Sequence, residues 1–148
     1  MNMKGYSAYQ KTNVTTAKKE DILLLLYEGC IKFVRIAKLK MAEKKIGEKG
    51  MNISKALAII SELINTLDHE KGGQLSADLE ALYMFMMDKL IEANIQNKSE
   101  DIEVVEKLLV TLHEAWEDVI KNPRPNGVPS KKLQPELYAA YLKQAQKK

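Results

Sequence analysis

Residues 22–27 read Ile-Leu-Leu-Leu-Leu-Tyr, and this uninterrupted apolar run is the strongest clue to the fold. It follows Glu20 and Asp21, and acidic residues of this kind favour the first turn of a helix. Successive helix residues are about 100° apart, so six apolar side chains in a row cover the whole circumference. One core cannot bury them all. The run predicts a helix that needs a second burial partner.

Outward from this run, the chain reads as amphipathic helices, because apolar residues recur three and four positions apart and glycine and proline are sparse. We expect Thr16 to cap the first helix and Ser76 to cap the third. The predicted helices cover about residues 17–44, the stretch from a turn at Gly47 and Gly50 to a point before Gly72-Gly73, residues 76–97 and residues 99–121.

These helices predict an all-α fold, an antiparallel four-helix bundle in a single domain of residues 1–148. Residues 17–121 would form the four-helix core. Residues 1–16 would form an N-terminal lid segment. Residues 122–148 would supply a proline-containing linker and a short extra C-terminal helix with Pro135 at its first position.

Bulk properties exclude several classes of protein. The net charge is only +3, and Arg35 and Arg124 are the only arginines, so nucleic acid is not an expected partner. No apolar stretch approaches the roughly 20 residues that cross a bilayer, and the N-terminus lacks a signal peptide's apolar middle. We therefore predict no membrane insertion and a cytoplasmic location. The single cysteine, Cys30, is expected to be a buried thiol.

Catalytic signatures are not recognisable. A bundle metal site commonly uses Glu-x-x-His pairs, but Thr66 precedes His69 by three residues and Val110 precedes His113 by three. No nucleophile triad or phosphate-binding loop is present. The sequence predicts a binding protein, not an enzyme, with no cofactor and no metal.

Three explanations remain open for the surplus apolar surface of residues 22–27: central burial in the domain, a homodimer interface, or a covering segment from this chain or a partner. Tyr6 and Tyr9 are amphipathic anchors in the segment before the first helix, which makes that segment a candidate lid. A self-associating regulatory or structural bundle without an unfolded client is therefore the alternative function.

Several short motifs occur in a recognisable order. They begin with Tyr6-Ser-Ala-Tyr9-Gln10, Val14-Thr-Thr16-Ala17 and Leu25-Leu26-Tyr27-Glu28-Gly29-Cys30-Ile31. They continue with Lys55-Ala56, Ile59-Ile60, Leu67-Asp68-His69-Glu70-Lys71-Gly72-Gly73, Leu79 to Met86, Glu92-Ala93-Asn94 and Ala115-Trp116. In this order the set resembles the flagellin export chaperones of the FliS family.

The resemblance implies a helical bundle that binds the disordered C-terminal segment of flagellin, prevents premature polymerisation and aids delivery to the flagellar type III export apparatus. It names flagellar export-gate and flagellar regulatory proteins as further candidate partners, and leaves open whether the chain is a monomer or a homodimer. In the family, a tyrosine-bearing N-terminal segment packs over a hydrophobic pocket until the client displaces it. Lys18-Lys19 and the residues from Pro123 onward depart from the family pattern.

The candidate client-binding or lid residues combine that segment with the apolar faces of the first three predicted helices. They are Tyr6, Tyr9, Ile22, Leu23, Leu26, Tyr27, Ile60, Ile64, Tyr83 and Met86.

Overall fold

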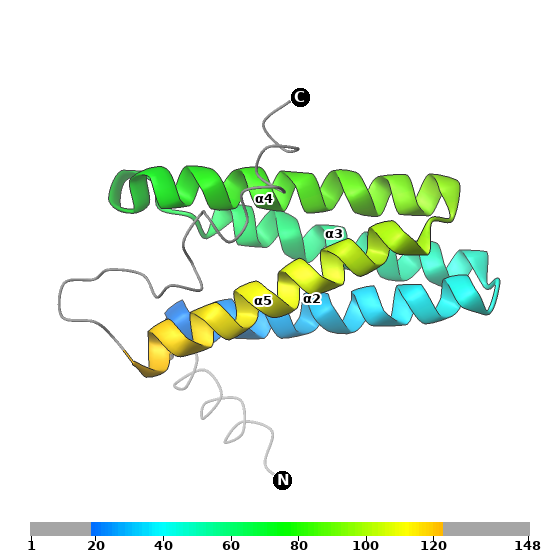
Figure 1. Cartoon of the computed structure of the whole chain (residues 1–148), viewed down its shortest axis with the longest axis horizontal. Coiled ribbons are helices and arrows are strands. Elements are labelled where there is room, and N and C mark those ends of the chain that lie inside the picture. Colours follow the sequence, from blue (N-terminus) through cyan, green and yellow to red (C-terminus); the bar gives the residue numbers. More distant parts are fainter. Residues whose placement is uncertain (1–18, 123–148) are drawn as a thin grey trace, which may run out of the picture.

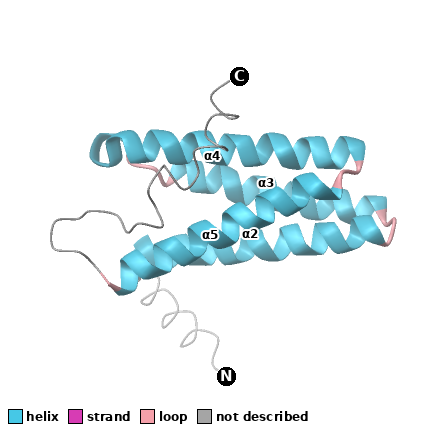
Figure 2. Ribbon diagram, viewed as in Figure 1, coloured by secondary structure: helices cyan, strands magenta, loops and turns pink. Residues whose placement is uncertain are grey.

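The computed structural model describes residues 19–122, which form four helices joined by short loops (Figure 2). They are α2 (Lys19–Ala42), α3 (Ile46–Asn65), α4 (His69–Gln96) and α5 (Ser99–Lys121). The predicted all-α fold is confirmed. The expected cap at Thr16, the N-terminal lid segment and the short C-terminal helix lie outside the described residues.

The four helices lie side by side along the long axis of the molecule, and each runs opposite to the helix before it (Figure 1). Helix α2 packs against α3 and α5, and α4 packs against the same two helices. The described helices therefore close into the predicted antiparallel four-helix bundle. None of the described helices is long and apolar enough to cross a membrane.

Each helix contributes one apolar stripe to a common core. The α3 stripe is buried at Ile53, Ala56, Ile60 and Leu63. Cys30 on α2 is also fully buried, and its Sγ lies 3.7 Å from the carbonyl oxygen of Ala56, to which it donates. Burial raises the pKa of the thiol to about 12, so it stays protonated at neutral pH. The prediction of a buried thiol is confirmed.

The turn predicted at Gly47 and Gly50 is wrong, because both glycines lie inside α3. The chain turns at residues 43–45, where Lys44 takes a left-handed conformation with φ 61°. Contacts of Lys49 favour a start of α3 before both glycines. The Lys49 side chain is only 2% exposed, and its Nζ donates to Asn94 O and to Asn97 Oδ1 at the end of α4. A lysine that satisfies the last carbonyl groups of a helix stabilises that helix end.

The boundary predicted at Gly72-Gly73 is also wrong. Helix α3 already ends at Asn65, and α4 begins at His69 under a cap from Asp68, whose Oδ1 accepts from Lys71 N at 3.0 Å. Gly73 then interrupts α4 with φ 51° and ψ −125°, a kink that glycine alone adopts without strain. The expected cap at Ser76 is wrong, because this residue lies about two turns past the start of α4.

An ion-pair cluster ties α2 to α5 near the middle of the bundle. Glu106 accepts from Arg35 Nε at 2.7 Å and from Lys38 Nζ at 3.0 Å. Burial raises the pKa of Glu106, but the hydrogen bonds and the positive charges of Arg35 and Lys38 together lower it by more, so the pKa lies below its ordinary value. The ionised carboxylate therefore stabilises the folded chain.

The Gly73 kink leads to a first prediction. Gly73→Ala should destabilise the bundle by about 1–3 kcal/mol, because an alanine is strained at this φ and ψ. The matched control is Gly47→Ala, at an exposed α3 position where an added Cβ meets nothing within 4 Å. This control should be neutral or stabilising by up to ~1 kcal/mol. Urea unfolding measures both, and equal effects would contradict the strain argument.

The Glu106 cluster leads to a second prediction, on pH. Because the folded pKa is lowered, the stabilisation is present above the unfolded pKa of about 4.3 and is lost as the pH falls through the folded pKa. Glu106→Gln should reduce the unfolding free energy at pH 7 by about 0.5–1 kcal/mol and flatten its decline below about pH 5.

The control for this pH experiment is Glu62→Gln, at an exposed α3 glutamate that makes no ion pair within residues 19–122. Thermal unfolding followed between pH 3 and pH 7 distinguishes the two variants. If Glu62→Gln flattens the acid decline as strongly as Glu106→Gln, the ion-pair cluster is not its source.

Candidate functional site

An apolar groove opens at the end of the bundle where α2 and α4 begin and α3 and α5 end. It consists of two adjoining hollows of about 430 and 260 Å³, which share Leu23 and Thr66. We call it the end groove. The smaller hollow draws side chains from α2, α4, α5 and the α3–α4 loop, and its apolar lining consists of Leu23, Leu67, Leu75, Leu79, Tyr83 and Trp116.

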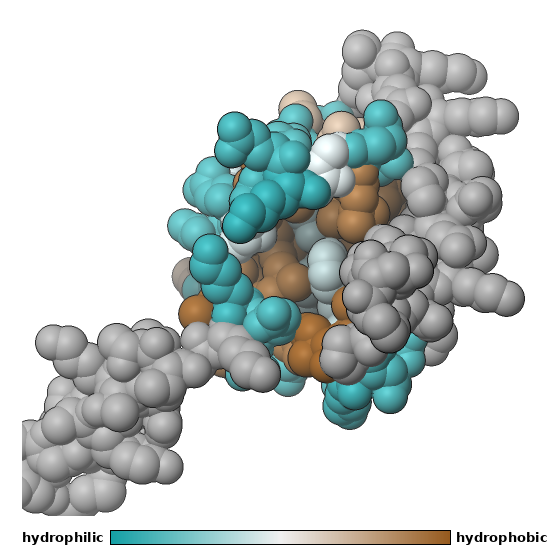
Figure 3. All heavy atoms as spheres, turned by 90° about the vertical axis from the view of Figure 1, so that its left-hand side faces the viewer, coloured by the Kyte–Doolittle hydropathy of each residue, from teal (hydrophilic) through white to brown (hydrophobic). Residues whose placement is uncertain are grey.

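Figure 3 faces this end of the molecule and shows hydrophobic side chains at the bottom of a depression bordered by hydrophilic ones. The polar border of the larger hollow includes Lys19, Glu20 and Asn65, with Ile22 and Leu23 supplying its apolar surface. A depression with an apolar floor and a charged border suits an amphipathic polypeptide segment better than a small polar metabolite.

One wall of the end groove is built by the α3–α4 loop and the first turns of α4. The carbonyl oxygen of Asp68 accepts from Gly72 N at 2.7 Å and from Ser76 Oγ at 3.0 Å. A Cβ on Gly72 would stand 1.9 Å from Ser76 Oγ, so the tight first turn of α4 requires glycine at this position. The local sequence thus fixes where Leu67 and Leu75 enter the groove.

Three polar aromatic groups tie the helices together at and below the floor, where Tyr83 and Trp116 line the groove and Tyr27 is buried against them. The hydroxyls of Tyr27 on α2 and Tyr83 on α4 form a short hydrogen bond, and Trp116 Nε1 on α5 donates to Tyr27 Oη at 3.3 Å. The Tyr27 and Tyr83 rings are tilted, with centroids 6.4 Å apart. Burial raises the pKa of Tyr83 well above its ordinary value, although the bond to Tyr27 lowers it. Tyr83 therefore stays neutral at physiological pH.

The sequence matches the family model of the flagellar protein FliS over residues 2–123. The chain belongs to the FliS family. It is 36% identical to the flagellar secretion chaperone FliS of Bacillus subtilis over 119 residues, which cover 80% of this chain and 88% of that protein.

Two further relatives are similar to this FliS family member to nearly the same degree. The flagellar secretion chaperone FliS of Campylobacter jejuni is 33% identical over 82% of this chain and 94% of its own length. That of Salmonella typhimurium is 32% identical over 78% of this chain and 89% of its own length. The motifs that carried the resemblance, from Leu67 to Gly73 with Leu79, Tyr83 and Trp116, include most of the smaller hollow's lining.

The structure places the candidate residues of this FliS family member in different environments. Tyr6 and Tyr9 lie outside the described residues. Ile22 is 41% exposed, and Leu23, Leu26 and Ile64 are half-buried against the core. The remaining four are fully buried core residues: Tyr27, Ile60, Tyr83 and Met86. Of the described candidates, Ile22, Leu23 and Tyr83 line the end groove.

Sequence reasoning missed several residues of the end groove, above all Leu67, Leu75, Leu79 and Trp116. Leu79 is buried in the core and Trp116 packs against it, and both also line the end groove. Leu67 and Leu75 flank the glycine pair that we had read as a helix boundary. With the start of α4 placed correctly at His69, the sequence would have predicted both leucines at this wall of the end groove.

The titratable residues form no catalytic cluster in the part of the chain that the structure describes. His113 Nε2 lies 3.5 Å from Glu28 Oε2, and His69 Nε2 lies 3.3 Å from Glu80 Oε2. Within residues 19–122, no group of three histidine, cysteine, aspartate or glutamate side chains is placed to hold a metal ion. The recognisable feature of the site is its apolar shape.

The groove floor leads to a third prediction. Tyr27→Phe should cost about 1–3 kcal/mol of stability, because it removes the partner of Tyr83 and the acceptor of Trp116. Tyr83→Phe should cost less, since the bond from Trp116 to Tyr27 survives. The double variant should cost less than the sum of the two. Urea unfolding in a double-mutant cycle tests this order, and strictly additive losses would contradict it.

Proposed function

We propose that this FliS family member is a flagellar export chaperone that binds the disordered C-terminal segment of flagellin and hands it to the flagellar type III export apparatus. The observation that carries the proposal is the end groove in a chain whose relatives are named flagellar secretion chaperones. Binding needs no covalent chemistry, so the role is non-enzymatic. It takes place in the cytoplasm, where new flagellin is made.

Apolar surface beside the end groove supports the proposal. On α2, Ile22 is 41% exposed and Leu25 is 66% exposed, although both belong to the apolar run with which α2 begins. Exposed apolar residues beside an apolar groove favour a partner that buries both. An amphipathic segment of a disordered client gains free energy by covering this surface. The conformational entropy that the segment loses on ordering offsets part of that gain.

The N-terminal segment is the proposed cover of the groove in the absence of client. Its last residues lead directly into Lys19, which lines the larger hollow, so Tyr6 and Tyr9 are tethered beside the groove. A tethered segment acts at a high effective concentration even when its contacts are weak. The client would displace it, because both occupy the same apolar surface.

The fourth prediction tests the client. Isothermal titration of the full chain with a peptide of the flagellin C-terminal region should show binding at micromolar concentrations or tighter. Ile22→Glu should weaken this binding at least tenfold, which corresponds to about 1.4 kcal/mol, because a charge replaces an isoleucine that lines the groove.

The matched control is Leu39→Glu, a change at an exposed leucine toward the other end of the same helix. It should bind the peptide as the unmodified chain does, and circular dichroism should show both variants folded. Absence of binding by the unmodified chain would refute the chaperone proposal. Equal binding by both variants would move the client away from the end groove.

Light scattering of the same samples addresses self-association. Under the proposal, the chain alone should give one mass over a wide concentration range, and the complex should add the mass of the peptide. A stable dimer that ignores the peptide would instead favour a self-associating bundle without an unfolded client.

A further inference from the structure

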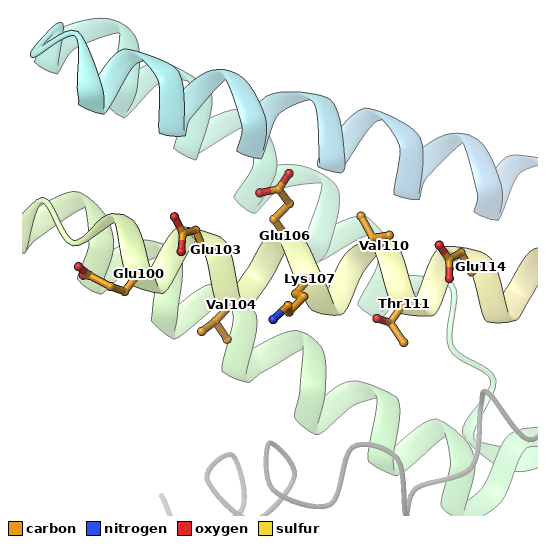
Figure 4. A pocket seen from close by; sticks show the side chains of 8 residues that line it. All are labelled: Glu100, Glu103, Val104, Glu106, Lys107, Val110, Thr111 and Glu114. Carbon is orange, nitrogen blue, oxygen red and sulfur yellow. The ribbon is translucent and has the colours of Figure 1, made fainter.

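The outer face of α5 carries an acidic surface that the end groove does not explain. Eight α5 residues line an open trough there: Glu100, Glu103, Val104, Glu106, Lys107, Val110, Thr111 and Glu114. We call it the acidic trough. In Figure 4, Glu106 points toward α2, while Val104, Lys107 and Thr111 lie on the opposite side of the helix. Val104 and Val110 are half-buried and give the trough an apolar strip.

The charges in the acidic trough are only partly neutralised. Glu106 is engaged by Arg35 and Lys38 of α2. Glu100, Glu103 and Glu114 form no ion pair with any residue in the range 19–122, and Lys107 is the one basic side chain among the lining residues. The trough therefore has a negative surplus beside an apolar strip. It suits a basic, amphipathic segment.

The sequence that follows α5 has this composition. Residues 123–148 contain six basic side chains and one acidic side chain, Glu136. Their apolar residues include Leu133, Leu137, Tyr138, Tyr141 and Leu142. Residues 124–148 also lie beyond the match to the FliS family model, so a role for them would be additional to the family pattern.

The point of attachment and the chain length allow this segment to reach the trough. Helix α5 ends at Lys121, and Glu114 and Glu100 lie about 10 and 32 Å back along it at 1.5 Å per residue. The ten residues from 123 to 132 span up to about 33 Å when extended, enough to reverse direction. Residues 133–148, if helical, would be about 24 Å long and would match the trough.

We propose that the C-terminal segment of this chain, residues 131–148, docks on the acidic trough of α5. Its lysines pair with Glu100, Glu103 and Glu114, and its apolar residues cover Val104 and Val110. The tether makes this contact intramolecular, so a weak interaction is enough to populate it. While the segment is docked, the trough is closed to any other basic partner.

The fifth prediction tests this contact in the full chain. Gln144→Cys introduces a labelling site for a nitroxide, and buried Cys30, whose pKa is raised, stays unreactive. Amide NMR signals of residues 103–114 should lose at least half their intensity relative to the reduced label. Signals of residues 54–58 on α3, diagonally across the bundle, should keep theirs.

Charge variants identify the cause of that intensity loss. Glu103→Gln combined with Glu114→Gln should restore most of the α5 signals, and so should 0.5 M salt, because exposed ion pairs are screened. The control combines Glu62→Gln with Glu70→Gln, two exposed glutamates outside the trough, and should leave the loss unchanged.

Three outcomes would overturn the proposal. The first is an even loss of signal over all helices. The second is a loss centred on the exposed apolar residues Met84, Ile91 and Ile95 of α4, which would place the segment there. The third is a loss that persists when nitrogen-15-labelled chains without nitroxide are mixed with nitroxide-bearing chains, which would identify a second copy as the occupant. None of these outcomes depends on whether the chain binds flagellin.

Discussion

A helix with apolar side chains all around its circumference must be buried on more than one side, and this constraint governs α2. Tyr27 is fully buried in the bundle, while Leu23 and Leu26 pack half-buried against it. The neighbouring helices α3 and α5 cannot reach the remaining face. Ile22 and Leu25 therefore stay exposed at the end where α2 begins. The bundle buries part of the apolar run, and the remaining apolar side chains of the run are exposed at its open end.

Different hydrogen bonds stabilise the two ends of the bundle. At one end, buried Lys49 donates to groups at the C-terminus of α4 and holds α3 close beside it. At the other end, the carbonyl oxygen of Asp68 accepts hydrogen bonds from Gly72 N and Ser76 Oγ, and the chain bends at Gly73 between these two donors. Polar contacts tie the helices together at the first end, where a hollow of about 380 Å³ has four lysines in its lining. The second end carries the apolar end groove, and this is where the apolar run begins.

Periodicity was sufficient to predict the helices, the core stripes and the antiparallel order, because a 3.6-residue repeat and short loops leave few arrangements. It failed at Gly47, Gly50 and Gly72-Gly73. Glycine usually marks a helix end, but here a tertiary contact of Lys49 and the local cap of Asp68 decide the boundaries. For the site, periodicity cannot separate a side chain that fills the core from one that also lines an opening. Trp116 and Leu79 do both.

The floor of the end groove explains how an opening persists in so small a bundle. A wholly apolar floor would gain free energy by collapsing or by covering itself with more apolar surface. The linked Tyr27, Tyr83 and Trp116 groups instead have fixed directions, because each must keep its polar partner once it is buried. They hold three helices at a set separation. Under the proposed function, a groove held open in this way would spare an incoming segment the cost of reorganising the bundle, so the ordering of the segment itself would be the main cost of binding.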